Sequence, residues 1–199
     1  MKTGWEARLN LRYSREGART VLCEKSHVGP LVVQKAFYPE GPSVCHSVIL
    51  HPPGGVAAGD SLSIASTAGQ DAHALLTTPG ATKWYRSTGP IAEQSVTLSV
   101  ATGGSLEWLP QENIMFDRAQ VRMRHLVHLA EGARYIGWDI TRLGRTASGE
   151  RFAAGDFRSR TEVVQAGRRL WGHQAGRRPS GHQLDAFLKR LELFRSRLS

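Results

Sequence analysis

The sequence predicts an all-β protein built from many short strands. Apolar and polar residues alternate in several segments, as they do in strands with one face in water. Gly and Pro interrupt the chain roughly every eight to twelve residues, which leaves little room for helices. The 199 residues, 40% hydrophobic and 22% charged, are enough to bury a core in one large or two small domains, and this composition excludes a disordered chain.

The predicted strands follow one another from the N-terminus. Residues 5–13 alternate apolar side chains with Glu, Arg and Asn, and the same alternation recurs at 95–100 and 121–129. Shorter apolar runs, too brief for helices, predict strands at 31–33, 44–50, 61–65, 72–76 and 134–140. No repeat of fixed period is visible, so the strand pattern itself favours no solenoid and leaves a β-sandwich open.

The C-terminal segment has a different pattern. Its apolar residues recur at the spacing of one helix face, at Leu184, Phe187, Leu188, Leu191, Phe194 and Leu198. Ser180 or Asp185 lies near the start of this segment, and Arg197 lies near its end, where a cation suits the helix dipole. We therefore expect one amphipathic helix over residues 181–198.

The positive charge is concentrated in the same part of the chain. The sequence holds 26 Lys and Arg against 17 Asp and Glu, a net charge of +9, and residues 158–199 carry +7 of it. A nucleic-acid-binding module is one hypothesis for this tail, because arginines neutralise phosphates. Few aromatic residues are interleaved with these arginines, so a solvated or protein-docking tail is a stronger interpretation than nucleic-acid binding.

No segment approaches the roughly 18 consecutive apolar residues of a membrane span. The N-terminal residues enter the alternating pattern at once, without the apolar core of a signal peptide. We therefore expect a cytoplasmic protein with no membrane partner.

Motifs for metal, nucleotide or nucleophile chemistry are weak. On a strand, Cys45 and His46 point to opposite faces, as do His46 and His51, so they predict no tight metal site. The glycine-rich turns lack the spacing of a phosphate-binding loop.

Glu107 and Asp139 stand beside tryptophans in apolar runs, where a carboxylate is costly unless it is paired or used. Structural ion pairs explain such acids, and a carboxylate-dependent β-fold hydrolase is the alternative.

Six stretches carry distinctive motifs: Gly29-Pro30-Leu31 with the residues to 35, the segment 38–41, Cys45-His46 through His51-Pro52-Pro53-Gly54-Gly55 to Asp60, the segment 77–86, Glu107-Trp108-Leu109-Pro110 within 106–117, and Trp138-Asp139-Ile140 within 138–150. In order and spacing they resemble the family of UreD (UreH) urease accessory proteins, over residues of about 4–170.

This resemblance implies a non-catalytic scaffold, or metallochaperone, whose strands wind in a solenoid-like manner. Such a protein works with UreF and UreG so that nickel reaches the active site of apo-urease. It holds no tightly bound cofactor: Ni²⁺ passes transiently, and GTP is used by UreG.

The resemblance also gives the acidic residues a function. Asp60, Glu107, Asp139 and Glu150 are expected to line or gate a nickel path, because weak successive oxygen and nitrogen ligands release an ion that a tight cage would trap. Thr82 and Lys83 would set the charge nearby, and His46 and His51 are weaker supporting candidates.

The resemblance ends near residue 170. We therefore expect a UreD-like β domain at 1–170 and a divergent basic segment at 171–199. The family continues here with more β structure, which takes part in the contact with UreF, so the chain is expected to be short at its C-terminus.

Overall fold

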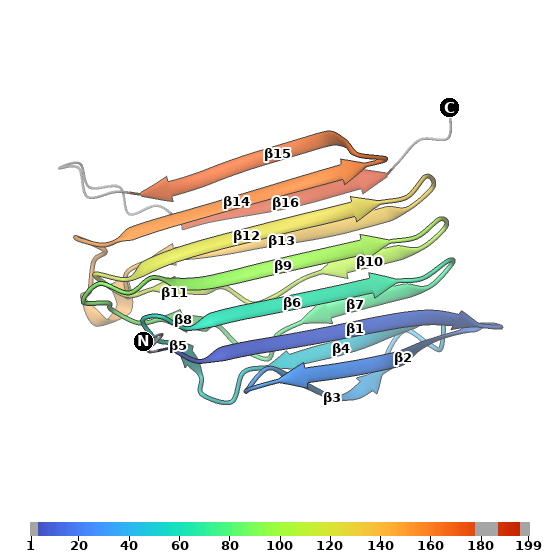
Figure 1. Cartoon of the computed structure of the whole chain (residues 1–199), viewed down its shortest axis with the longest axis horizontal. Coiled ribbons are helices and arrows are strands. Elements are labelled where there is room, and N and C mark those ends of the chain that lie inside the picture. Colours follow the sequence, from blue (N-terminus) through green and yellow to red (C-terminus); the bar gives the residue numbers. More distant parts are fainter. Residues whose placement is uncertain (1–3, 178–186, 196–199) are drawn as a thin grey trace.

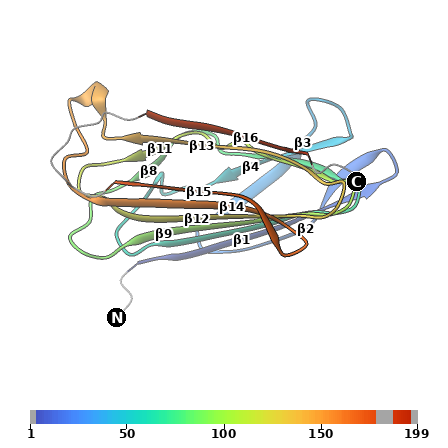
Figure 2. The same ribbon diagram turned by 90° about the horizontal axis from the view of Figure 1, so that it is seen from above.

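Two β-sheets lie face to face in the computed structural model, which describes residues 4–177 and 187–195 (Figures 1 and 2). Sheet A has the order β15-β14-β12-β9-β6-β1-β2. Its strands are β1 (Glu6–Glu16), β2 (Arg19–Val28), β6 (Ser61–Ala68), β9 (Ala92–Val100), β12 (Gln120–Leu129), β14 (Asp156–Gln165) and β15 (Arg168–Arg177).

Sheet B has the order β3-β4-β7-β10-β13-β11-β8-β5, with β16 paired to β13. Its strands are β3 (Val32–Phe37), β4 (Val44–Leu50), β5 (Gly55–Val56), β7 (His73–Thr77), β8 (Thr82–Trp84), β10 (Ser105–Trp108), β11 (Asn113–Met115), β13 (Arg134–Leu143) and β16 (Phe187–Arg195). One short 3₁₀ turn, η1 (Thr146–Ser148), is the only helical element in the described part of the chain. The all-β prediction is confirmed. In the same ranges no helix is long and apolar enough to cross a membrane.

The chain winds as a solenoid, because it passes from one sheet to the other and back while strands of successive coils pair in parallel. Ser61 pairs with Glu93, and Glu93 with Arg122, so these two coils are 32 and 29 residues long. The next coil, from Gln120 to Asp156, takes 36 residues. Coils of unequal length explain why the solenoid leaves no fixed period in the sequence.

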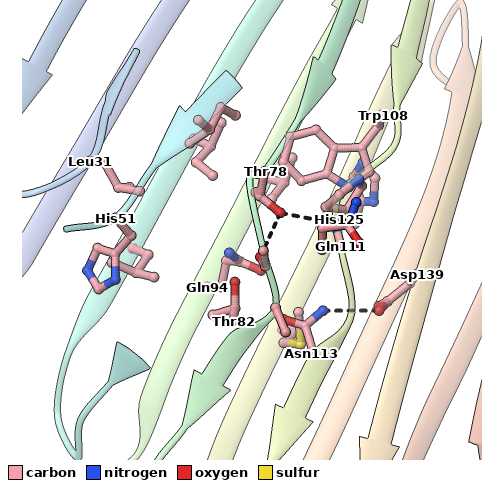
Figure 3. A pocket seen from close by; sticks show the side chains of 18 of the residues that line it. Leu31, His51, Thr78, Thr82, Gln94, Trp108, Gln111, Asn113, His125 and Asp139 are labelled. Carbon is pink, nitrogen blue, oxygen red and sulfur yellow. Dashed lines mark hydrogen bonds between the residues drawn. The ribbon is translucent and has the colours of Figure 1, made fainter. Parts of the chain in front are cut away.

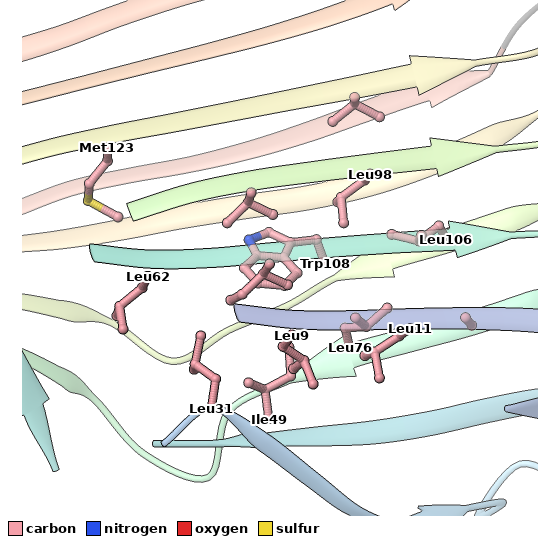
Figure 4. Packing of buried hydrophobic residues seen from close by; sticks show 14 of the residues in the cluster. Leu9, Leu11, Leu31, Ile49, Leu62, Leu76, Leu98, Leu106, Trp108 and Met123 are labelled. Carbon is pink, nitrogen blue, oxygen red and sulfur yellow. The ribbon is translucent and has the colours of Figure 1, made fainter. Parts of the chain in front are cut away.

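Alternating burial runs through most strands and builds the core between the sheets. Along β1 every second side chain from Ala7 to Tyr13 is buried, including Leu9 and Leu11. Strands of a parallel sheet are commonly apolar on both faces because helices cover them, but here each sheet has one face in water. The buried residues of both sheets form one cluster, part of which Figure 4 shows around Leu76, Leu106 and Trp108.

Sheet B is interrupted at the same level in three successive coils. In each of these coils its strand is divided in two, as β4 and β5, β7 and β8, and β10 and β11. The dividing loops, 51–54, 78–81 and 109–112, all contain Pro, which has no N–H to donate to a ladder. Strand β13 runs unbroken past the gap and pairs with both β10 and β11.

The predicted C-terminal helix is wrong where the structure describes it. Residues 187–195 form β16, which pairs antiparallel with β13, whereas 181–186 and 196–198 lie outside the described residues. The edge of β13 offers a row of backbone donors and acceptors, and pairing with them outweighs a helical pattern in the sequence. The division at residue 170 stays a prediction; β15 spans this position.

Candidate functional site

A cavity of about 470 Å³ lies between the sheets beside the interruption of sheet B (Figure 3). Apolar residues form much of its wall, among them Leu31, Ile49, Leu62, Trp108 and Met123. The polar residues that line it come from both sheets and from the dividing loops: His51, Thr78, Thr82, Lys83, Gln94, Gln111, Asn113, Arg124, His125, Asp139 and Ser159. The cavity therefore joins polar groups from several coils inside an apolar frame.

Side-chain hydrogen bonds hold the dividing loops together where strand pairing stops. The backbone N–H of Gln111 donates to Oγ1 of Thr78 over 3.0 Å. Oγ1 of Thr77 donates to the carbonyl of Leu109 over 2.7 Å. Nε1 of Trp138 donates to the carbonyl of Pro110, also over 2.7 Å. These bonds fix the cavity wall without a continuous ladder.

Asp139 is the central carboxylate of the site. Its Oδ1 accepts hydrogen bonds from Nδ2 of Asn113 at 3.3 Å and from Oγ1 of Thr141 at 3.2 Å, and Figure 3 shows the contact with Asn113. Burial raises the pKa of Asp139, and the two hydrogen bonds oppose this shift only in part. Both bonds end on Oδ1, so neither of them occupies Oδ2.

His125 is the second ionisable group in the cavity wall. Burial lowers the pKa of its imidazole to about 4, so the ring is neutral near pH 7. Its ring makes edge contacts with those of Trp108 and Tyr135, with centroids 5.7 and 6.2 Å apart. Nε2 of His125 lies 3.4 Å from the hydroxyl of Tyr135.

His51 faces the other end of the cavity, next to Asp60. Burial lowers the pKa of His51, and the carboxylate of Asp60 opposes this shift. Nδ1 of His51 is buried and has no hydrogen-bond partner among the residues that the structure describes. Asp60 itself accepts hydrogen bonds from the backbone N–H groups of Trp5 and Ala57, each over 2.8 Å. It therefore both fixes a turn and acts on His51.

The cavity brings together four of the eight residues singled out from the sequence, namely His51, Thr82, Lys83 and Asp139. The other four are not among its lining residues. Glu107 accepts a hydrogen bond from Nε2 of His73 at 2.7 Å.

Glu150 pairs with Arg145 at 2.7 Å, where the chain turns after β13. His46 lies 2.7 Å from a carboxylate oxygen of Glu40. Among the residues whose side chains the structure describes, Asp139 is the one carboxylate in the cavity lining, and the hydrolase hypothesis lacks a second acid there. In the described part of the chain, no three His, Cys, Asp or Glu side chains are grouped to hold a metal ion.

Two members of the site, Asn113 and His125, were not among the predicted site residues. Asn113 follows the Glu107-Trp108 motif, and its Oδ1 accepts a hydrogen bond from Nε1 of Trp84 at 3.0 Å. His125 occupies an inward position of the alternating segment 121–129. A histidine at an apolar position of a strand is the signal that would have pointed to it.

Comparisons with known proteins agree on one family. A family model described as "UreD urease accessory protein" matches residues 6–194. A urease accessory protein UreD of Janthinobacterium sp. (strain Marseille) is 52% identical over 169 residues, which are 85% of this chain and 57% of that protein. The UreD protein of Dechloromonas aromatica is 54% identical over 84% of this chain and 58% of its own length. The UreD protein of Cupriavidus necator is 53% identical over 86% of this chain and 59% of its own length. The chain thus spans less than two thirds of the length of these curated relatives.

Proposed function

This chain belongs to the family of UreD urease accessory proteins, and we propose that it is a non-catalytic scaffold for the incorporation of nickel into apo-urease. It works in the cytoplasm, with UreF and UreG as partners. The observation that carries the proposal is the identity of 52–54% to proteins named urease accessory protein UreD. Those names describe accessory proteins and no enzyme.

The cavity supports a path for the nickel ion as cargo. Ni²⁺ binds imidazole nitrogen and carboxylate oxygen, and a path needs ligands that hold it weakly and one after another. His51 and His125 offer neutral imidazoles, and Asp139 offers a carboxylate, from separate places in the wall. No cofactor is held tightly, and GTP is used by UreG.

Asp139 is the residue on which this path most depends. A proton and a cation compete for its carboxylate, and the raised pKa makes this competition stronger than at an exposed acid. The hydrogen bonds from Asn113 and Thr141 orient Oδ1. Lys83 adds a positive charge to the lining and Thr82 a hydroxyl, so a divalent cation is held only loosely.

Asp60 takes part through His51, because its carboxylate acts on the charge of that imidazole. Glu107, Glu150 and His46 make ion pairs or hydrogen bonds away from the cavity lining. Their part in the path stays a prediction, which the following experiment separates from that of Asp139.

The test is urease activation in cells that produce urease, UreF, UreG and this chain. Asp139→Asn keeps an acceptor for Asn113 but removes the charge, so we expect less nickel per urease and lower urease activity with unchanged complex formation. Glu107→Gln is the matched variant outside the cavity and is expected to have the smaller effect. Full urease activation with Asp139→Asn would contradict a nickel path through the cavity. An equal loss of activity in both variants would mean that the path is not confined to the cavity.

A further inference from the structure

Four arginines form a block on the outer face of sheet A. Arg122 and Arg124 lie two residues apart on β12, and Arg158 and Arg160 lie two apart on β14. In the parallel register, Arg122 is the partner of Arg158 and Arg124 is the partner of Arg160. Like charges directly opposite each other on neighbouring strands repel, so this arrangement is unfavourable unless anions neutralise it.

Two carboxylates of the chain neutralise the block in part. Asp156 lies within 2.7 Å of Arg122 and 3.2 Å of Arg158. Glu162 lies within 2.8 Å of Arg160 and 3.6 Å of Arg169. Each of these carboxylates is thus shared by two guanidinium groups, which leaves positive charge in excess around both.

Arg124 stands between these two clusters with no ion pair to any residue in ranges 4–177 and 187–195. On the other side of β12, Glu93 of β9 is the register partner of Arg122. With Arg169 included, five arginines face three acids on this surface.

The positive groups also reach further into solvent than the acids that pair with them. The side chains of Asp156 and Glu162 are 19% and 25% exposed, against 45% and 52% for Arg158 and Arg160. A hollow of about 480 Å³ lies over the block, and β15 contributes Gln174 and Gly176 to it. Gly176 is the register partner of Arg158 and has no side chain to fill the space above β14.

We propose that this surface, defined by Arg122, Arg124, Arg158 and Arg160, binds an extended acidic segment of a partner protein. Alternate side chains of a strand lie on one face about 6.6 Å apart, the same spacing that separates Arg122 from Arg124 along β12. A carboxylate of the partner fits between Arg124 and Arg160 as Asp156 already lies between Arg122 and Arg158. The partner's carboxylate would thus contact Arg124 and Arg160 in the way that Asp156 contacts Arg122 and Arg158.

A nucleic acid fits this surface less well. Asp156, Glu162 and Glu93 would repel a phosphate backbone, and the exposed side chains of the block include no aromatic ring on which bases stack. A protein segment with acids at alternate positions places its carboxylates at the arginines, and its neutral side chains point away from the surface.

The test uses the purified chain and short labelled peptides in a fluorescence anisotropy titration at low and physiological salt. One peptide carries Glu at alternate positions with Ser between, and its isomer carries the same residues with all Glu consecutive. We expect the alternating peptide to bind more tightly, with an affinity that falls as salt screens the charges.

Arg124→Gln and Arg160→Gln are each expected to weaken binding roughly tenfold, because each removes a charge-assisted hydrogen bond. Arg12→Gln is the matched control, since Arg12 is exposed on the same face of sheet A and pairs with Glu24 on β2; it is expected to change nothing. A thermal melt of each variant verifies the fold.

Three results would overturn the proposal. The first is that neither peptide binds, and the second is that both bind equally well. The third is that a single-stranded oligonucleotide binds more tightly than the alternating peptide and loses that affinity in Arg124→Gln, which would make nucleic acid the ligand of this surface. Because no urease component is present, the outcome is independent of the proposed function in nickel delivery.

Discussion

Nδ2 of Asn113 donates a hydrogen bond to Oδ1 of Asp139 over 3.3 Å and so links β11 to β13 at the wall of the cavity. The other end of the same amide accepts a hydrogen bond from Nε1 of Trp84, a fully buried side chain. Asn113 therefore connects the packing of the core to the carboxylate of the site.

Asn113→Ala is expected to lower the free energy of unfolding by about 2 kcal/mol, because the buried Nε1 of Trp84 loses its acceptor. Chemical denaturation monitored by tryptophan fluorescence measures this. Asn10→Ala is the control, since Asn10 is exposed and its side chain donates to the hydroxyl of Ser26 at 3.3 Å. Equal stability of the two variants would show that the bond to Trp84 contributes nothing.

His125 is expected to make stability depend on pH. The unfolded chain binds a proton at this residue near pH 6.5, but the folded chain binds it only near pH 4. Stability is therefore lost as the pH falls from about 6.5 to 4, by about 3 kcal/mol in all. Denaturation curves measured across this pH range should show that the free energy of unfolding depends less on pH in His125→Gln than in the parent chain. The exposed His27 supplies the control, and a His27→Gln profile that changes as much would contradict the assignment.

Asp60→Ala is expected to destabilise the chain by about 2 kcal/mol even without any urease component, because the N–H groups of Trp5 and Ala57 lose their acceptor. Thermal unfolding measures the effect. Glu131→Ala, at an exposed acid in another turn, is expected to be neutral. If Asp60→Ala unfolds like the parent chain, the carboxylate is not needed for this turn.

Gly144→Ala tests the turn that follows β13. Gly144 has a φ of +82°, and an added Cβ would lie 2.6 Å from the backbone oxygen of Glu150. Gly17→Ala is the control: Gly17 also has a positive φ, of +56°, but no atom lies within 4 Å of an added Cβ. Both variants pay roughly 1 kcal/mol for the left-handed backbone, so the excess loss in Gly144→Ala measures the steric contact. Equal losses would mean that the chain at Glu150 moves aside freely.

The sequence predicted several strands whose two faces differ, and it missed β2, whose faces do not. The alternation at 5–13 and 121–129 corresponds to β1 and β12, because one side of each is in the core. Strand β2 is exposed along most of its length, so it leaves no alternating pattern. Residues 187–195 were expected to be helical, because a pairing with the distant β13 has no signature in a local window.

The candidate site was only partly predictable for a related reason. Asp139 was identified from its place between Trp138 and Ile140, since a carboxylate in an apolar run needs a partner. Glu107 has the same local setting, yet its partner is His73 and it lies outside the cavity lining. Which of two such acids faces inward depends on strand register, and register is fixed by pairing between coils.

The three dividing loops of sheet B have a consequence for hydrogen exchange and for access to the interior. In 78–81 and 109–112, side-chain contacts replace part of the ladder. A local opening there breaks a few such contacts and leaves both flanking strand segments paired, so its free energy lies below that of global unfolding. Amide protons of these loops should exchange ahead of those in β7 and β10, and water reaches the space between the sheets without separation of the sheets.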